Sequence, residues 1–189
     1  LAVALAKRYV EQARAEGDPR YLGYAQAALA PWYTLERPPS DVLVLRATLR
    51  QSTHQFGAAL ADLDTVLRRD PGNAQAWLTR ATVQMVSGDH EGARASCARL
   101  DGRAPALVVQ ACRSNVGSIS GQAQASYASL GRVLESAPDA GPGLRAWGLT
   151  LLAEMAARGG DAEAAGRHFR QALAIDANDS YLLAAYADF

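Results

Sequence analysis

The chain has 189 residues, and its 19 basic and 19 acidic side chains leave it without formal net charge. The length suits one domain of ordinary size. A nucleic-acid binder usually has a net positive charge or a cluster of basic residues, and this sequence has neither. Alanine accounts for 40 residues and aromatic types for only 7%, which favours closely packed helices over sheets.

The chain ends fall inside predicted helices. The first predicted helix runs from Leu1 to Glu16, and the last runs from Tyr181 to Phe189. Because the chain opens on Leu1 rather than Met, we expect it to be a fragment of a longer protein, from which a signal peptide or neighbouring domains have been lost. The compartment therefore stays open between the cytoplasm and an exported location. Its apolar stretches all fall short of the roughly 20 residues of a membrane span, so we expect no membrane insertion by this fragment.

Three kinds of residue recur along the chain with a common period. Prolines, small residues and glycines return after 33 or 34 positions, and after 39 across one interval: Pro71, Pro105 and Pro138; Ala59, Ala93, Ser126 and Ala165; Gly88, Gly121 and Gly160. A unit of this length is a helical hairpin, which cannot bury both of its apolar faces alone and stacks on its neighbours. The sequence therefore predicts an α-solenoid.

One period shows how the hairpin is made. Ala76 to Ser87 is a first helix, Gly88-Asp89 is the turn, and Glu91 to Leu100 is a second helix. Glycine supplies the left-handed conformation that closes a helix, and the aspartate can cap the free N–H groups of the next helix. The small residue at Ala93 lets the paired helices approach closely.

Two stretches carry a family resemblance. Residues 56–77 read FGAALADLDTVLRRDPGNAQAW, and residues 160–178 run from GDAEAA to ALAIDAN. These stretches resemble the tetratricopeptide repeat, whose unit of about 34 residues has small residues where its helices cross and a closing proline. The resemblance implies an all-α, right-handed α-solenoid of about five hairpins plus a truncated terminal helix.

The resemblance also places the repeats within a single solenoid over 1–189. They fall at about 1–31 (divergent), 40–73, 74–106, 107–139 and 146–179, with the first helix of a further repeat at 180–189. Three departures stand out. His54-Gln55 replaces a turn glycine, Gln110 replaces a large apolar residue, and an insertion near Asp139 to Gly143 lengthens one interval.

Residues that could carry chemistry are few. His54, His90 and His168 lie in no metal-ligand signature, and the chain contains no nucleophile elbow, phosphate-binding loop or dinucleotide fingerprint. We therefore expect neither catalysis nor a cofactor.

The two cysteines allow two interpretations. Cys97 lies on the core face of a second helix and Cys112 in the next first helix, so a disulfide is geometrically reasonable. The alternative is two buried thiols that act as small apolar residues. An exported location is favoured only if the two cysteines are bonded.

Three arginines also follow the period. Arg46, Arg80 and Arg113 recur after 34 and 33 residues, each in a first helix. One hypothesis is a ladder of bidentate donors for an acidic peptide. The other, which the resemblance favours, is a structural ladder whose stems pack between helices and whose guanidinium groups pair with Asp62 or Asp64.

The resemblance further implies that the first helices line a concave, partner-binding groove. The register of the repeat also places Asp41, Val44 and Gln75 in this groove, whereas the single lysine, Lys7, is expected to lie outside it. A surface of this kind suits an extended or helical apolar segment of a protein better than a charged terminus. The expected groove residues are Leu45, Thr48, Leu78, Thr82, Met85, Asn115, Trp147, Leu151, Glu154 and Arg158.

We therefore predict a non-catalytic scaffold module that binds a protein or peptide segment. One alternative is a spacer or self-association arm that joins copies weakly through its solenoid ends, where the last helix would expose Leu182, Leu183, Tyr186 and Phe189. Another is a regulatory arm of an enzyme whose catalytic domain lies elsewhere. The chain uses arginine far more often than lysine and is rich in alanine. This composition is typical of a bacterial protein encoded by GC-rich DNA.

Overall fold

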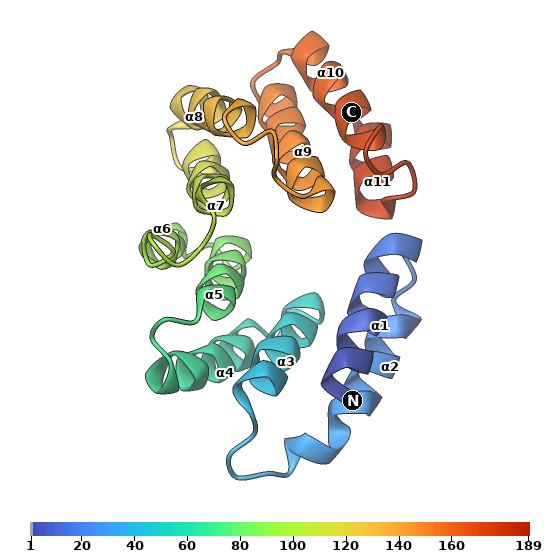
Figure 1. Ribbon diagram of the computed structural model, residues 1–189, viewed down its shortest axis with the longest axis vertical. Helices are drawn as coiled ribbons and strands as arrows, with labels where there is room; N and C mark the ends of the chain where they lie inside the picture. Colours follow the sequence, from blue (N-terminus) through green and yellow to red (C-terminus); the bar gives the residue numbers. More distant parts are fainter. Residues whose placement is uncertain (1) are drawn as a thin grey trace. The chain divides into compact units, whose positions relative to one another are not determined.

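The computed structural model describes residues 2–189, and every regular element among them is an α-helix (Figure 1). The predicted all-α fold of helical hairpins is thus confirmed. The chain forms two compact units, unit 1 (Leu1–Arg103) and unit 2 (Ala104–Phe189). The single continuous solenoid stays a prediction, and the predicted helix start at Leu1 lies outside the described residues.

Unit 1 consists of three antiparallel hairpins. Each first helix packs against its own second helix, and it also packs against the first helix of the next hairpin, so that α1 contacts α3 and α3 contacts α5. The helices are α1 (Ala2–Glu16), α2 (Arg20–Tyr33), α3 (Ser40–Ser52), α4 (Phe56–Arg69), α5 (Ala74–Val86) and α6 (His90–Ala98).

Unit 2 contains two further hairpins and one more helix. Here α7 pairs with α8 and α9 with α10, while α11 packs on α10. The helices are α7 (Ala106–Ile119), α8 (Ala123–Glu135), α9 (Pro142–Arg158), α10 (Ala162–Leu173) and α11 (Ser180–Asp188).

Two helix boundaries differ from the predicted repeat limits. Helix α2 continues through Pro31 to Tyr33, beyond the predicted end of the first hairpin. Helix α9 begins at Pro142, before the predicted start near Ala146. Proline at the first helical position has no N–H to lose and already holds a helical φ. Part of the expected insertion is therefore the first turn of α9.

The turns between paired helices use a left-handed residue, as the glycine period predicts. Gly88, Gly121 and Gly160 have φ of 87°, 85° and 80°. In the hairpin that lacks the glycine, His54 takes the same conformation with φ of 58°, and its ring packs edge-on against Phe56 at 5.6 Å between centroids. The turn geometry is thus kept at the cost of a strained histidine backbone.

Small residues lie where paired helices cross. Ala59, Ala93 and Ala165 are completely buried, and Ser126 is 7% exposed. In the hairpin of Ser126, the crossing is polar: Gln110 donates from Nε2 to Ser114 Oγ at 2.8 Å, and Ser114 donates to the carbonyl oxygen of Ser126 at 2.9 Å. This chain of hydrogen bonds explains why Gln110 replaces an apolar residue here.

Candidate functional site

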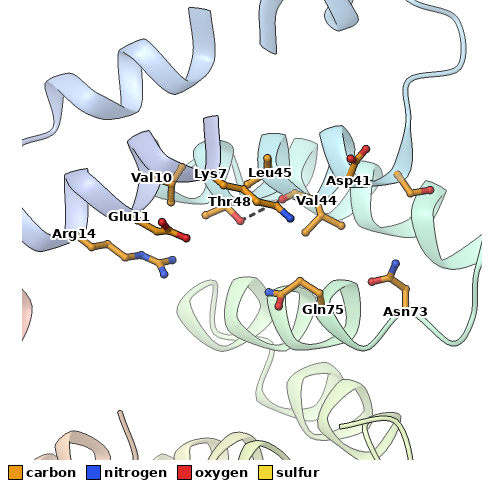
Figure 2. A pocket seen from close by; sticks show the side chains of 11 residues that line it. Lys7, Val10, Glu11, Arg14, Asp41, Val44, Leu45, Thr48, Asn73 and Gln75 are labelled. Carbon is orange, nitrogen blue, oxygen red and sulfur yellow. Dashed lines mark hydrogen bonds between the residues drawn. The ribbon is translucent and has the colours of Figure 1, made fainter. Parts of the chain in front are cut away.

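Unit 1 contains a cleft of about 490 Å³ between α1, α3 and the start of α5. In Figure 2 the side chains of Asn73 and Gln75 lie across the cleft from those of α1 and α3. The lining residues are Lys7, Val10, Glu11, Arg14, Ser40, Asp41, Val44, Leu45, Thr48, Asn73 and Gln75.

Local hydrogen bonds fix the walls of this cleft. Asn73 is the N-cap of α5 and accepts from the backbone N–H of Ala76 at 2.9 Å. Gln75 donates from Nε2 to Thr79 Oγ1 at 3.3 Å, and Thr48 donates from Oγ1 to the carbonyl oxygen of Val44 at 3.2 Å (Figure 2). These bonds hold short polar side chains in fixed directions, as a preformed binding surface requires.

The cleft combines an apolar strip with charges of both signs. Val10 and Leu45 are 7% and 8% exposed and belong to the core between α1 and α3, while Lys7, Glu11 and Asp41 are exposed at its rim. Such a surface offers apolar contact together with charged groups that select a partner by complementarity.

The structure corrects the expected position of the single lysine. Lys7 was expected outside the groove, but it lines the cleft together with Glu11 and Arg14. These three residues stand at i, i+4 and i+7 along α1 and so share one helix face. That spacing is visible in the sequence, but the first hairpin departs too far from the repeat for its register to be assigned.

The predicted groove residues of unit 1 separate into two groups. Leu45 and Thr48 line the cleft, as do the inward-pointing Asp41, Val44 and Gln75. The α5 residues lie outside its lining: Leu78 and Met85 are half-buried and Thr82 is exposed.

The predicted groove residues of unit 2 also differ in exposure. Asn115 on α7 and Trp147 on α9 are half-buried. Glu154 accepts a hydrogen bond from the Tyr181 hydroxyl at 2.6 Å, and Arg158 donates to Ser118 Oγ at 3.1 Å. Leu151, in contrast, is 5% exposed and lies in the unit 2 core, so it offers almost no surface to a partner.

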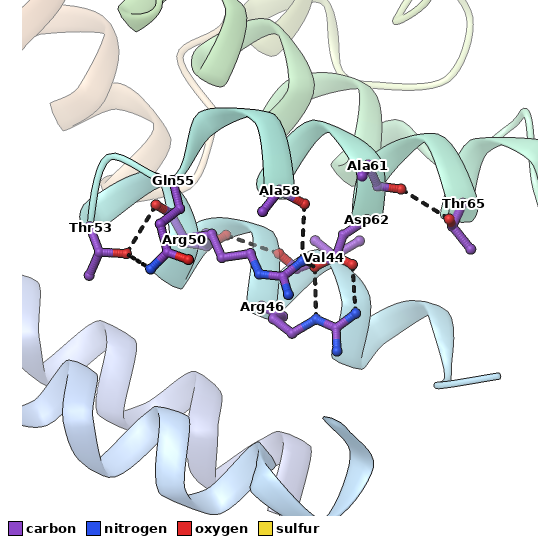
Figure 3. A network of polar contacts seen from close by, with 10 residues as sticks. Val44, Arg46, Arg50, Thr53, Gln55, Ala58, Ala61, Asp62 and Thr65 are labelled. Atoms are coloured by element: carbon purple, nitrogen blue, oxygen red, sulfur yellow. Dashed lines mark hydrogen bonds and ion pairs between the residues drawn. The ribbon is translucent and has the colours of Figure 1, made fainter. Parts of the chain in front are cut away.

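Asp62 on α4 is the buried centre of a polar contact that joins α3 to α4 (Figure 3). Arg46 donates from Nε to Oδ2 at 2.8 Å and from Nη2 to Oδ1 at 2.6 Å, while Arg50 donates to Oδ2 at 2.6 Å and to the Ala58 carbonyl at 3.0 Å. The guanidinium of Arg46 also lies 5.2 Å from the ring centroid of Tyr33 on α2. The hydrogen bond to Asp62 raises the pKa of Arg46 above its ordinary value.

The other two arginines of the period have different surroundings. Arg80 forms an ion pair with Asp64 and lies 5.9 Å from the ring centroid of Trp77, which Arg99 approaches to 4.9 Å. Arg113 is an exposed residue of α7 in unit 2. Within unit 1, therefore, both periodic arginines pair with a carboxylate of the preceding or following second helix.

Both cysteines are buried. Cys97 on α6 is fully buried and Cys112 on α7 is 5% exposed. The bond between them stays a prediction, as does the exported location that would depend on it.

The exposure of the last helix differs from the prediction. Leu182 was expected on the surface, but it is fully buried in the unit 2 core. Tyr186 stacks on Phe169 at 5.1 Å, and Phe189 lies 5.6 Å from the same ring. Leu183 and Phe189 remain 45% and 47% exposed, as predicted. The apolar end surface expected for self-association is therefore smaller than predicted.

Residues 2–189 hold neither a candidate metal site nor a membrane-spanning helix. No group of three or more His, Cys, Asp or Glu side chains able to hold a metal ion occurs in this part of the chain. Over the same residues, each helix is too short or too polar to cross a membrane.

Comparison with known proteins identifies the fold. A family model of the tetratricopeptide repeat matches residues 52–112, and no curated protein matches the chain. The crystal structure of a thermophilic tetratricopeptide-repeat protein of Thermus thermophilus is 17% identical, with a TM-score of 0.73 over 99% of this chain and 96% of that one. The MamA RS-1 ArsTM double mutant is 15% identical, with a TM-score of 0.55 over 95% of this chain and 97% of that one. Residues 52–112 therefore carry the tetratricopeptide repeat, and the chain has the fold of tetratricopeptide-repeat proteins.

Proposed function

We propose that the protein is a non-catalytic scaffold and that the cleft of unit 1 binds an extended segment of a partner protein. The observation that carries this proposal is the cleft itself. Its volume of about 490 Å³ lies within the range of about 300–1,000 Å³ typical of ligand pockets. The tetratricopeptide fold supports a role in protein interaction in general, and the cleft supports this location for it.

The lining indicates the chemistry of the segment. Apolar side chains of the segment would contact Val10, Val44 and Leu45 along the middle of the cleft. Lys7 on α1 would face an acidic side chain, and Asp41 at the start of α3 would face a basic one. The half-buried Thr48 and the exposed Gln75 supply hydroxyl and amide groups for the backbone of the segment.

The test is to select a peptide from a random library on the wild-type protein and to measure its Kd for cleft variants. Lys7→Glu reverses a charge at the rim, and Gln75→Arg adds bulk to the opposite wall. We expect each to weaken binding about tenfold or more, which corresponds to about 1.4 kcal/mol. Both residues are exposed, so the variants should fold normally.

Each variant has a matched control. Arg8→Glu makes the same charge change at the adjacent, exposed residue of α1, which faces away from the cleft. Gln26→Arg makes the same change at an exposed residue of α2 that does not line the cleft. Unchanged affinity in both cleft variants, or equal losses in variants and controls, would contradict the proposal.

A further inference from the structure

Unit 2 contains a smaller pocket of about 210 Å³ at the beginnings of α9 and α11. Trp147 and Tyr181 contribute aromatic rings to its wall, and Ile175, Asp176 and Asp179 belong to the segment that leads into α11. The remaining lining residues are Pro142, Gly143, Ala146 and Thr150.

The wall of this pocket is held in place by hydrogen bonds. Tyr181 donates its hydroxyl proton to Glu154 Oε1 at 2.6 Å, which ties α11 to α9. The pKa of Tyr181 is raised, mainly because burial withdraws its hydroxyl from water and to a smaller extent because the hydroxyl bonds to Glu154. The Tyr181 residue is nevertheless 62% exposed, so its ring remains accessible to a ligand.

The pocket carries negative charge. Asp179 is the N-cap of α11 and accepts from the N–H of Leu182 at 3.0 Å, and Asp176 accepts from the N–H of Asn178 at 3.1 Å. The positive end of the α11 helix dipole offsets about half of one negative charge. The two carboxylates therefore leave the pocket with a net negative charge. Among the residues that the structure describes, its lining includes no lysine, arginine or histidine.

We propose that this pocket receives an arginine side chain of a partner polypeptide. A planar guanidinium stacks on aromatic faces such as those of Trp147 and Tyr181 and forms paired hydrogen bonds with carboxylates such as Asp176 and Asp179. Its methylene stem would lie against Ile175. The volume is below that of pockets for drug-sized ligands and therefore suits a single long side chain.

This inference concerns unit 2 alone and goes beyond the proposed role of the unit 1 cleft. Its probe is a short acetylated peptide with one central arginine, and its matched probes carry citrulline or lysine at that position. Citrulline has nearly the shape of arginine without its charge. The readout is the NMR signal of the Trp147 indole N–H, with Trp32 and Trp77 of unit 1 as internal references in the same spectrum.

We expect the arginine peptide to shift the Trp147 signal saturably and to leave those of Trp32 and Trp77 unchanged. The citrulline peptide should cause no shift, and the lysine peptide should bind several-fold more weakly than the arginine peptide. A Trp147 signal that does not respond to the arginine peptide, or that responds equally to citrulline, would overturn the proposal. Equal affinity for lysine would overturn the assignment to a guanidinium.

Variants of the full chain complete the test. The double variant Asp176→Asn, Asp179→Asn removes both charges and keeps the cap of α11, because asparagine caps helices as well as aspartate does. We expect its Kd for the arginine peptide to rise about tenfold or more. Asp188→Asn makes one such charge change on the exposed end of α11 and should bind as the wild type does. Equal affinity in the double variant and the wild type would rule out recognition by these carboxylates.

Discussion

Arg46 and Asp62 form a bidentate ion pair between α3 and α4, with donor–acceptor distances of 2.8 and 2.6 Å. Their side chains are only 13% and 7% exposed. A carboxylate buried to this extent depends on its donors, because its charge would otherwise lie in a poorly solvating environment.

Asp62→Asn should lower the free energy of unfolding by about 3–5 kcal/mol, the usual cost of breaking a buried pair. Two guanidinium groups, those of Arg46 and Arg50, would lose their common carboxylate. Urea denaturation followed by circular dichroism measures the change. Asp64→Asn is the matched control, because Asp64 has a side chain that is 42% exposed in its pair with Arg80, and its loss should cost about 1 kcal/mol or less. Equal effects of the two substitutions would contradict the role assigned to burial.

Gly92→Ala should destabilise unit 1 by about 1–3 kcal/mol, as overpacking of a filled site does. An added Cβ at Gly92 would overlap Asp89 Oδ2 and Gln84 Nε2. Those two atoms are hydrogen-bonded at 2.9 Å, and Asp89 also caps α6. Gly57→Ala, at a similar place in α4, meets no neighbouring atom and should raise stability by up to about 1 kcal/mol. Thermal melts of both variants measure this difference in stability. An unchanged melting temperature in Gly92→Ala would show that the Asp89 cap can rearrange to accommodate the added methyl group.

His54→Gly should stabilise the protein by up to about 1 kcal/mol, because glycine adopts the left-handed conformation without the penalty that other residues pay. The φ of His54 is 58°, and the equivalent positions in the other four hairpins, Gly17, Gly88, Gly121 and Gly160, are glycines with positive φ. The melting temperature is the measurement. Ala61→Gly, at an exposed position in the middle of α4, should instead lower stability by about 0.5–1 kcal/mol. A loss in both variants would mean that the contact of His54 with Phe56 outweighs the backbone strain.

Stability should fall as the pH is lowered through the titration of His168. Burial lowers the pKa of this histidine below its ordinary 6.5, with a smaller contribution of the same sign from Arg167, while Gln171 and Asp161 oppose the shift. The unfolded chain therefore binds the proton more readily, and stability is lost between pH 6.5 and the lower pKa of the folded state. The Tyr127 hydroxyl lies 2.8 Å from His168 Nε2, which helps to hold the ring in this place.

His168→Gln is the variant that checks this dependence. The free energy of unfolding, measured by denaturation at a series of pH values, should vary less over this window in the variant than in the wild type. Identical pH profiles would show that His168 does not contribute to the acid sensitivity.

The sequence alone determined the repeat and the internal structure of each hairpin. The glycine period located the left-handed turns, and the small-residue period located the helix crossings at Ala59, Ala93 and Ala165, all fully buried. These features depend on residues within about one hairpin of each other. A regular period therefore reports them directly, through backbone conformation and the alternation of apolar and polar faces.

Only the tertiary structure decided which element covers each helix face. In the folded chain, Lys7, Glu11 and Arg14 of the divergent first hairpin line the cleft. Arg46 pairs with Asp62, whereas Arg80 pairs with Asp64. Leu182 is buried, whereas the neighbouring Leu183 is exposed. The fold also brings Trp147 together with Asp176 and Tyr181 in one pocket. The periodicity of one helix identifies its apolar face, but the packing partner of that face depends on contacts between segments far apart in the chain, which a local pattern does not encode.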